Sequence, residues 1–204
     1  MNTTRVILIG GTSHTGKSTL AQALRQMLGW DCVATDRLAR HPGRPWKTPH
    51  KAVPPHVADH YRSLSADELL ADVLCHYQGL WPSISDTIRR HATDPSVPGL
   101  IIEGSALWPS YVAALDVAEV RGVWLTASDA FLQQRIYANS QFDQAAEQEK
   151  VLIQRFLERT LRYNHRMMVE VHQLGLVSVN VEEVSSLRRL ADHCLSLFSQ
   201  PPHR

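Results

Sequence analysis

The chain has 204 residues, 44% of them hydrophobic, and its 21 basic and 20 acidic side chains leave a formal net charge of +1. This size fits a single domain over residues 1–204 with a sizeable core, and the balanced charge favours neither a nucleic-acid partner nor an anionic membrane. No apolar run reaches the roughly 20 residues of a transmembrane helix, and no signal peptide is visible. We therefore expect a cytoplasmic monomer or homodimer whose cysteines are reduced and buried.

Short apolar runs alternate with helical patterns along the chain. Strands are predicted over residues 5–9, 32–35, 99–103, 120–125 and 176–180. Helices are predicted over about 17–28, 65–77, 82–90, 128–136, 144–173 and 183–198. This alternation is typical of an α/β fold in which helices cover both faces of a parallel sheet.

Several of these helices carry recognisable end signals. Gly29 follows the first helix as a C-cap. Ser65 and Glu68 form a capping box, and Ser128 is placed to cap the helix that it precedes. Pro82 is predicted to interrupt the helical pattern, so that a new helix begins there.

The loop after the first strand carries the most specific motif of the sequence. Residues 11–18 read GTSHTGKS and match the phosphate-binding pattern GxxxxGK[ST], between a predicted strand and a predicted helix. In such a loop the backbone N–H groups surround phosphate oxygens, Lys17 neutralises the β- and γ-phosphates, and Ser18 binds Mg²⁺. The predicted nucleotide-binding residues are Gly11, Thr12, Ser13, His14, Thr15, Gly16, Lys17, Ser18 and Thr19. We expect ATP and Mg²⁺ to bind here; a plain glycine-rich turn is the alternative.

Two acidic residues follow neighbouring strands of the predicted sheet. Asp36 comes after the second strand, and Glu103 ends the third. Because ligands of open α/β sheets bind at the carboxyl ends of the strands, both carboxylates are expected near the γ-phosphate. Asp36 is the predicted catalytic base, with binding of Mg²⁺ through water or a helix-capping role as alternatives. Glu103 is predicted to bind Mg²⁺ through a water molecule or to contact the acceptor.

Residues 41–60 hold five prolines and show no periodicity. This composition predicts a loop that covers the substrate, or alternatively an uninvolved surface loop. The basic residues at its start suit a carboxylate or phosphate group of an acceptor: Arg37, Arg40 and Arg44. The candidates for lining an acceptor pocket, with core packing as the alternative, are Trp46, Trp81 and Trp108.

The long helix predicted near the C-terminus carries a row of arginines. Their spacing places them on one stripe opposite the apolar face: Arg155, Arg159, Arg162 and Arg166. Such a row can stabilise a transferred phosphoryl group. It is also what a solvated helix face shows, and Glu158 can pair with Arg162 four residues on. Arg155 and Arg159 are the better candidates for catalysis because they lie nearest to a predicted lid.

The segments GGTSHTGKSTLA, VATDRLAR and LIIEGSALWP resemble, in this order, segments of the P-loop small-molecule kinases related to nucleoside monophosphate kinases. They are most similar to the 2-phosphoglycerate kinase-like branch, and the Glu-Gly pair also occurs in uridine kinase-like enzymes. The resemblance implies a five-stranded parallel sheet of order 2-3-1-4-5 in a three-layer sandwich. It also implies an acceptor-binding insertion over 41–96, a helical lid over 137–160, and Arg135 near the adenine or the phosphates.

The predicted function is therefore transfer of the γ-phosphate of Mg-ATP to a hydroxyl or phosphate group of a small metabolite. An antibiotic or natural product is an alternative acceptor. A nucleotide-dependent switch or regulatory ATPase is the alternative of another class. The chain has no Asn-Lys-x-Asp motif of the kind that GTPases use, and it is short for a AAA module with its helical lid domain.

Overall fold

The computed structural model of the chain describes residues 4–38, 43–48 and 52–198. The strands are β1 Val6–Gly11, β2 Asp31–Ala34, β3 Leu100–Glu103, β4 Val120–Thr126 and β5 Ser178–Asn180. The α-helices are α1 Lys17–Leu28, α2 Pro55–Ser63, α3 Ala66–Thr93, α4 Pro109–Ala113, α5 Asp129–Ser140, α6 Glu147–Gln173 and α7 Leu187–Phe198. Single 3₁₀ turns follow β2, α5 and β5.

The strands form one parallel sheet in the order β2-β3-β1-β4-β5. This confirms the predicted α/β fold and its strand order. All strands point the same way, so the loops after β1, β2 and β3 meet at one edge of the sheet. In the register of the sheet, Glu103 lies between Ile9 of β1 and Ala34 of β2. The two predicted acids thus end neighbouring strands.

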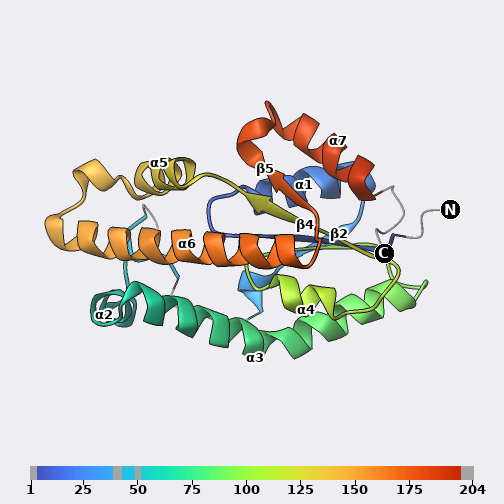
Figure 1. Ribbon diagram of the computed structural model, residues 1–204, viewed down its shortest axis with the longest axis horizontal. Helices are drawn as coiled ribbons and strands as arrows, with labels where there is room; N and C mark the ends of the chain where they lie inside the picture. Colours follow the sequence, from blue (N-terminus) through green and yellow to red (C-terminus); the bar gives the residue numbers. More distant parts are fainter. Residues whose placement is uncertain (1–3, 39–42, 49–51, 199–204) are drawn as a thin grey trace.

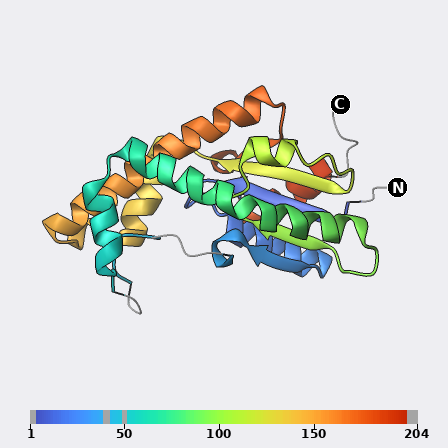
Figure 2. The same cartoon turned by 90° about the horizontal axis from the view of Figure 1, so that it is seen from below.

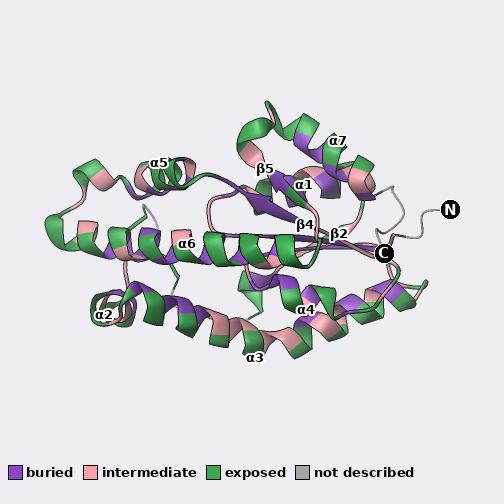
Figure 3. Cartoon of the chain, viewed as in Figure 1, coloured by how far each residue is buried: buried purple, intermediate pink, exposed green. Residues whose placement is uncertain are grey.

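Helices cover both faces of the sheet, as Figure 1 shows for α1 and α7 on one side and α3 and α4 on the other. Alternate residues of each strand face opposite layers. Ile7 and Ile9 pack with Leu20 and Leu24 of α1, whereas Val6 and Leu8 pack in the layer formed by α3, α4 and the second half of α6. Buried residues follow the inner faces of α3 and α6, and exposed residues follow the outer faces (Figure 3).

A third apolar cluster lies beyond the end of the sheet. The residues before α2 and α2 itself, the start of α3, the end of α5 and the first half of α6 pack there, as seen at one end of Figure 2. Its buried members are Trp46, Val57, Tyr61, Leu69, Ile136, Leu152, Ile153, Phe156 and Leu157. The sheet therefore carries a helical extension with its own core, and this extension contains parts of both segments expected to form the insertion and the lid.

Two predictions of secondary structure were wrong. Helix α3 continues through Pro82, because its apolar stripe runs on to Ile84 and Ile88, which are buried against the sheet layer. Pro82 and Gln78 are both exposed, so the carbonyl that loses its helical partner can bond to water. Residues 55–63, expected as loop, form helix α2, with Pro55 at the first turn, where proline is tolerated.

The three predicted helix caps are confirmed. Gly29 adopts a left-handed conformation (φ 68°) after α1, Ser65 and Glu68 form the capping box of α3, and the Ser128 side chain accepts a bond from Phe131 N–H. No helix of the described residues is long and apolar enough to cross a membrane. Cys194 is buried as expected, but Cys32 is only half-buried and Cys75, on the outer side of α3, is exposed.

Gly104, directly after β3, allows the ends of β2 and β3 to approach closely. Its φ is +151°, and a Cβ atom there would lie 1.8 Å from Thr35 Oγ1. We expect Gly104→Ala to lower the free energy of unfolding by about 2 kcal/mol or more, through crowding and backbone strain. Gly79→Ala is the matched control, since nothing lies within 4 Å of its Cβ position in α3; it should stabilise by roughly 0.5–1 kcal/mol. Urea unfolding of both variants measures this, and equal midpoints would contradict it.

Candidate active site

The phosphate-binding loop joins β1 to α1 at the carboxyl edge of the sheet. Gly11, His14 and Gly16 all have positive φ, which curls the loop ahead of the helix. Thr15 Oγ1 donates to Thr12 O (2.9 Å), and Lys17 Nζ donates to the same carbonyl (2.6 Å). The loop thus closes on itself, with the Lys17 amine held at its centre and the positive end of α1 behind it.

The Lys17 side chain is buried and its environment favours loss of its proton. Burial lowers the pKa of Lys17, while the carboxylates of Glu103 and Asp36 act in the opposite direction and Arg44 adds to the lowering. Among the described residues a backbone carbonyl is the direct partner that the Lys17 amine has, and burying a cation with so little compensation is costly. A polyanion bound in the loop would supply the missing negative charge.

Ser18 and Glu103 form an oxygen pair beside the loop. Ser18 Oγ donates to Glu103 Oε1 (2.9 Å), and Glu103 is only 7% exposed at the end of β3. Mg²⁺ prefers oxygen ligands and usually keeps several waters while it binds one or two protein groups and the phosphates of a substrate. The Ser18 hydroxyl and the Glu103 carboxylate fit such a site, one directly and one through water. The described residues contain no cluster of three or more His, Cys, Asp or Glu side chains that would hold a metal alone.

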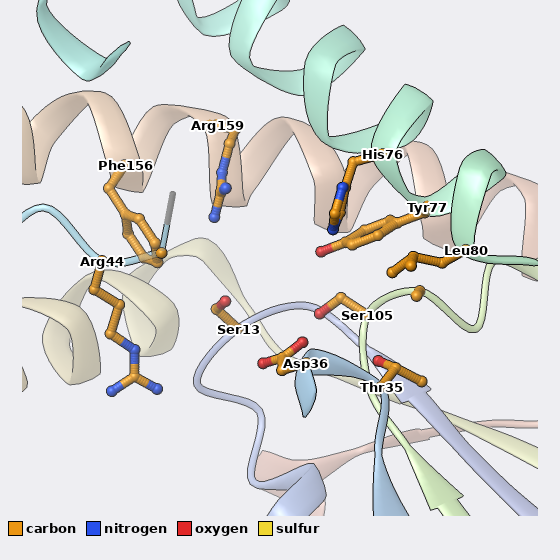
Figure 4. Close-up of a pocket in the computed structure, with 12 residues that line it drawn as sticks. Ser13, Thr35, Asp36, Arg44, His76, Tyr77, Leu80, Ser105, Phe156 and Arg159 are labelled. Carbon is orange, nitrogen blue, oxygen red and sulfur yellow. The ribbon is translucent and has the colours of Figure 1, made fainter. Parts of the chain in front are cut away.

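Two cavities adjoin at this edge of the sheet. One, of about 540 Å³, lies over the loop and is lined by His14, Lys17, Ser18, Glu103 and Arg135, among others. The other, of about 240 Å³, lies between the sheet edge, α3 and α6 (Figure 4). Both are lined by Ser13, Asp36, Arg44 and Ser105. Asp36 therefore stands at the boundary between the cavity over the loop and the cavity between α3 and α6.

A third cavity, of about 470 Å³, adjoins the loop on its other side. It shares Gly16, Thr19 and Arg135 with the cavity over the loop. Its remaining walls are Thr15 of the loop, Phe131 of α5 and residues from Val181 to Leu190, with Val184 and Leu187 among them. The Arg135 guanidinium lies over the Phe131 ring at 4.6 Å and donates to His14 O (3.3 Å). This mixed apolar and cationic pocket has the character of a site for a flat aromatic base.

The predicted arginines take different positions. Arg135 and Arg44 line the cavities, and Arg40 lies outside the described residues. Arg37 is exposed and lines none of the three cavities described above. Arg155 also lines none of them and pairs with Glu158 (3.3 Å). Arg159 is 8% exposed and lines the cavity of about 240 Å³.

The four arginines of α6 therefore do not form one solvated stripe: the alternative of a solvated face holds for Arg162 and Arg166 but not for Arg159. Arg162 pairs with Asp67 of α3 (2.7 Å), not with Glu158. Helix α6 packs on α2, α3 and α5 as well as on the sheet layer, so more than one of its faces is covered. Arg159 falls on a covered face, whereas Arg162 and Arg166 are exposed.

The three tryptophans line none of these cavities. Trp46 is buried against Phe156, with ring centroids 4.9 Å apart, and Trp108 is buried against Tyr163 at 5.1 Å. Trp81 packs on Tyr111. All three tryptophans therefore pack in or against the core, which was the alternative to lining an acceptor pocket.

His14 is the loop residue that contacts the helical extension. Its ring lies 6.0 Å from the rings of both Trp46 and Phe156. Burial and the nearby Arg44 cation lower the pKa of His14 to about 4, so the imidazole is neutral at pH 7. The side chain thus adds no charge to the loop and serves as a packing contact between the loop and the extension.

Sequence reasoning missed the residues that α3 contributes to the second cavity. His76, Tyr77 and Leu80 point into it from one side. Burial raises the pKa of Tyr77 to about 12, so its hydroxyl stays protonated. Ser105, after Gly104, donates to Gly11 O (2.9 Å) and links the loop to β3. No local motif in the sequence marks the three residues of α3 as part of a site. Ser105 could have been proposed as a site residue, because it lies only two residues after Glu103.

No family model matches the sequence, and no curated protein is detectably similar to it. Solved structures do match. A gluconokinase from Sinorhizobium meliloti 1021 is 19% identical, with 98% of this chain and 94% of that chain covered and a TM-score of 0.53. Deoxyadenosine kinase from M. mycoides with bound dATP is 14% identical (95% and 99% covered, TM-score 0.52). Shikimate kinase from Aquifex aeolicus VF5 is 13% identical (94% and 94% covered, TM-score 0.51). At these identities the likeness establishes a fold shared with P-loop kinase structures.

Proposed function

We propose that the chain is an ATP-dependent phosphotransferase that acts on a small-molecule acceptor. The observation that carries the proposal is the row of three adjoining cavities, with the phosphate-binding loop in the middle and Asp36 at the boundary of the last two. A nucleotide switch needs a site for the nucleotide and no compartment beyond the γ-phosphate. A kinase needs that compartment for its acceptor.

In this proposal the nucleotide occupies the cavity of about 470 Å³ and the cavity of about 540 Å³ over the loop. The base lies between Phe131, Arg135 and Leu187, and the phosphates lie over residues 11–18 with Lys17 against the β- and γ-phosphates. Mg²⁺, held by Ser18 and through water by Glu103, neutralises charge on the phosphates when it is bound. The solved deoxyadenosine kinase binds dATP on the same fold, which supports a nucleotide site of this kind.

The acceptor occupies the cavity of about 240 Å³, with a hydroxyl group beside Asp36. The acceptor oxygen attacks the γ-phosphorus, its proton passes to the Asp36 carboxylate, and the bond from the γ-phosphorus to the bridging oxygen of ADP breaks. Holding the two substrates in line is the main contribution, because a loose transition state needs little proton removal at first. Ser13 and Ser105, shared by both cavities, are placed to orient the reacting groups.

We also propose that residues 41–96 bind the acceptor and that residues 137–160 act as a lid within one kinase domain. The third apolar cluster supports this, since it joins parts of both segments through Tyr61, Leu152 and Phe156. The Thr-Asp and Glu-Gly pairs at residues 35–36 and 103–104 favour the 2-phosphoglycerate kinase-like or uridine kinase-like branch.

The test is acceptor-dependent release of ADP from Mg-ATP, followed with a coupled assay over a panel of small hydroxylated and phosphorylated metabolites. We expect slow basal hydrolysis and a rise of about 10²-fold or more with a suitable acceptor, because the acceptor completes the reacting geometry. Turnover that no acceptor changes, with nucleotide still bound, would favour a switch instead.

A further inference from the structure

The cavity beyond Asp36 contains a buried cation, Arg159, that pairs with no carboxylate in the part of the chain that the structure describes. Arg159 is 8% exposed, and its guanidinium lies 4.6 Å from the centre of the Phe156 ring and 5.8 Å from that of Tyr61. Among the described residues, no carboxylate forms an ion pair with it. Cation–π contacts offset only part of the cost of burying a guanidinium. The unmet requirement is an anion that enters the cavity.

The other charged groups of the cavity do not meet this requirement. Figure 4 shows Arg159 and His76 reaching in from one side, with Ser13, Asp36 and Ser105 on the opposite side. Asp36, the acid of the cavity lining, is exposed and lies at the boundary with the loop. Arg44 donates to Asn139 (3.3 Å), and its guanidinium points away from Arg159 (Figure 4). The cavity is therefore cationic at the Arg159 end and anionic at the Asp36 end.

This polarity fits a molecule with an anionic group at one end and a hydroxyl group at the other. At about 240 Å³ the cavity has the space of roughly eight water molecules, which suits a small metabolite. A carboxylate carries one negative charge and can accept two parallel bonds from a guanidinium. A phosphate monoester carries a charge of about −1.5 to −2 near pH 7, and a single arginine cannot neutralise all of that charge. The polar groups between the ends, Ser13, Tyr77 and Ser105, suit further hydroxyl groups.

We infer that Arg159 binds the carboxylate of the acceptor, and that the acceptor is a small hydroxylated carboxylic acid whose reacting hydroxyl lies at Asp36. This rests on the proposed function and names the substrate class of its second site. It assigns Arg159 to the acceptor instead of to the transferred phosphoryl group, because Arg159 lines the cavity beyond Asp36 and not the one over the loop. The Tyr61 ring brings α2 into this contact, and its hydroxyl is tied to Gly43 O (2.9 Å).

Matched probes test the substrate class. Hydroxy acids of four to seven carbons, their primary amides, uncharged polyols and phosphate monoesters are compared on the full chain by ADP release. Their binding is measured by melting temperature in the presence of a non-hydrolysable ATP analogue. We expect the acids to raise the melting temperature and to be turned over, with kcat/KM about tenfold or more above that of the matching amides.

Variants test the residue. Arg159→Gln should raise the KM of the best acid by about tenfold or more, leave the KM of ATP unchanged and remove the preference for acid over amide. Arg159→Lys should recover part of the preference, and it remains informative if the glutamine variant does not fold. Arg62→Gln, which removes an exposed arginine paired with Asp59, is the control and should match the wild type.

Three results would overturn the inference while leaving the proposed function intact. They are equal use of acids and amides, a preference for phosphate monoesters, and an Arg159→Lys variant in which acid and amide kinetics fall together with the melting temperature. The last result would make Arg159 a purely structural residue. Failure of the proposed function looks different, because then no compound of any charge raises ADP release.

Discussion

Replacing Lys17 with Met is expected to reduce phosphoryl transfer by about 10³-fold or more. The Lys17 amine lies at the centre of the phosphate-binding loop, bonded to Thr12 O (2.6 Å), and in the proposed complex it turns to the β- and γ-phosphates. Methionine fills nearly the same volume but leaves the charge that develops on those phosphates without its buried cation. ADP release at saturating acceptor, and ATP affinity by calorimetry, measure the loss.

The unliganded fold should tolerate this change. Lys17 is buried with a lowered pKa, and an apolar side chain of similar shape often replaces a buried charge at little cost. We therefore expect the melting temperature of Lys17→Met to stay within a few degrees of the wild type, while the stabilisation by ATP is lost. Arg188→Met, on the exposed side of α7 and paired with Asp192, removes a positive charge elsewhere and should behave as the wild type. Unchanged ATP affinity and turnover in Lys17→Met would sink the assignment of the loop.

The sheet and the phosphate-binding loop could be predicted because local sequence decides them. The apolar run of β1, the glycines of the loop and the pattern of α1 follow one another within 28 residues, so the whole signal lies in one short stretch of sequence. The alternation of strands and helices then leaves few topologies. Asp36 and Glu103 were placed correctly because the carboxyl ends of parallel strands share one edge.

The second cavity could not be predicted, because its walls come from contacts between distant segments. The role proposed for Arg159 depends on α2, whose Tyr61 covers one side of α6. Residues 41–60 show no periodic pattern that would predict this helix. A helical pattern separates one apolar face from one polar face. Helix α6 has several neighbours, so the polar stripe read from the sequence contains both a buried arginine and exposed ones. The helix break predicted at Pro82 was wrong for a related reason. Packing of the apolar stripe of α3 against the sheet layer outweighs the local tendency of proline to end a helix.

Substitution of Asp36 tests which of the two acids, Asp36 or Glu103, acts as the catalytic base. Asp36 lines both the cavity over the loop and the cavity of about 240 Å³. Glu103 lines only the cavity over the loop, and it accepts a hydrogen bond from Ser18 Oγ (2.9 Å). A base must reach the acceptor hydroxyl, and a group that holds Mg²⁺ must reach the phosphates. This difference in position favours Asp36 as the base and Glu103 as the partner of the metal-bound water.

Asp36→Asn should therefore keep ATP affinity and lose phosphoryl transfer by about 10²-fold or more, because asparagine can orient the hydroxyl but cannot take its proton. Asp31→Asn is the matched control: the same change at the opposite end of β2, on an exposed side chain, should leave turnover unaltered. Glu103→Gln should instead raise the Mg²⁺ concentration needed for half-maximal activity, since the carboxylate that orders the metal-bound water is lost. An Asp36→Asn variant nearly as active as the wild type, beside an inactive Glu103→Gln that added Mg²⁺ does not rescue, would show that the two roles are reversed.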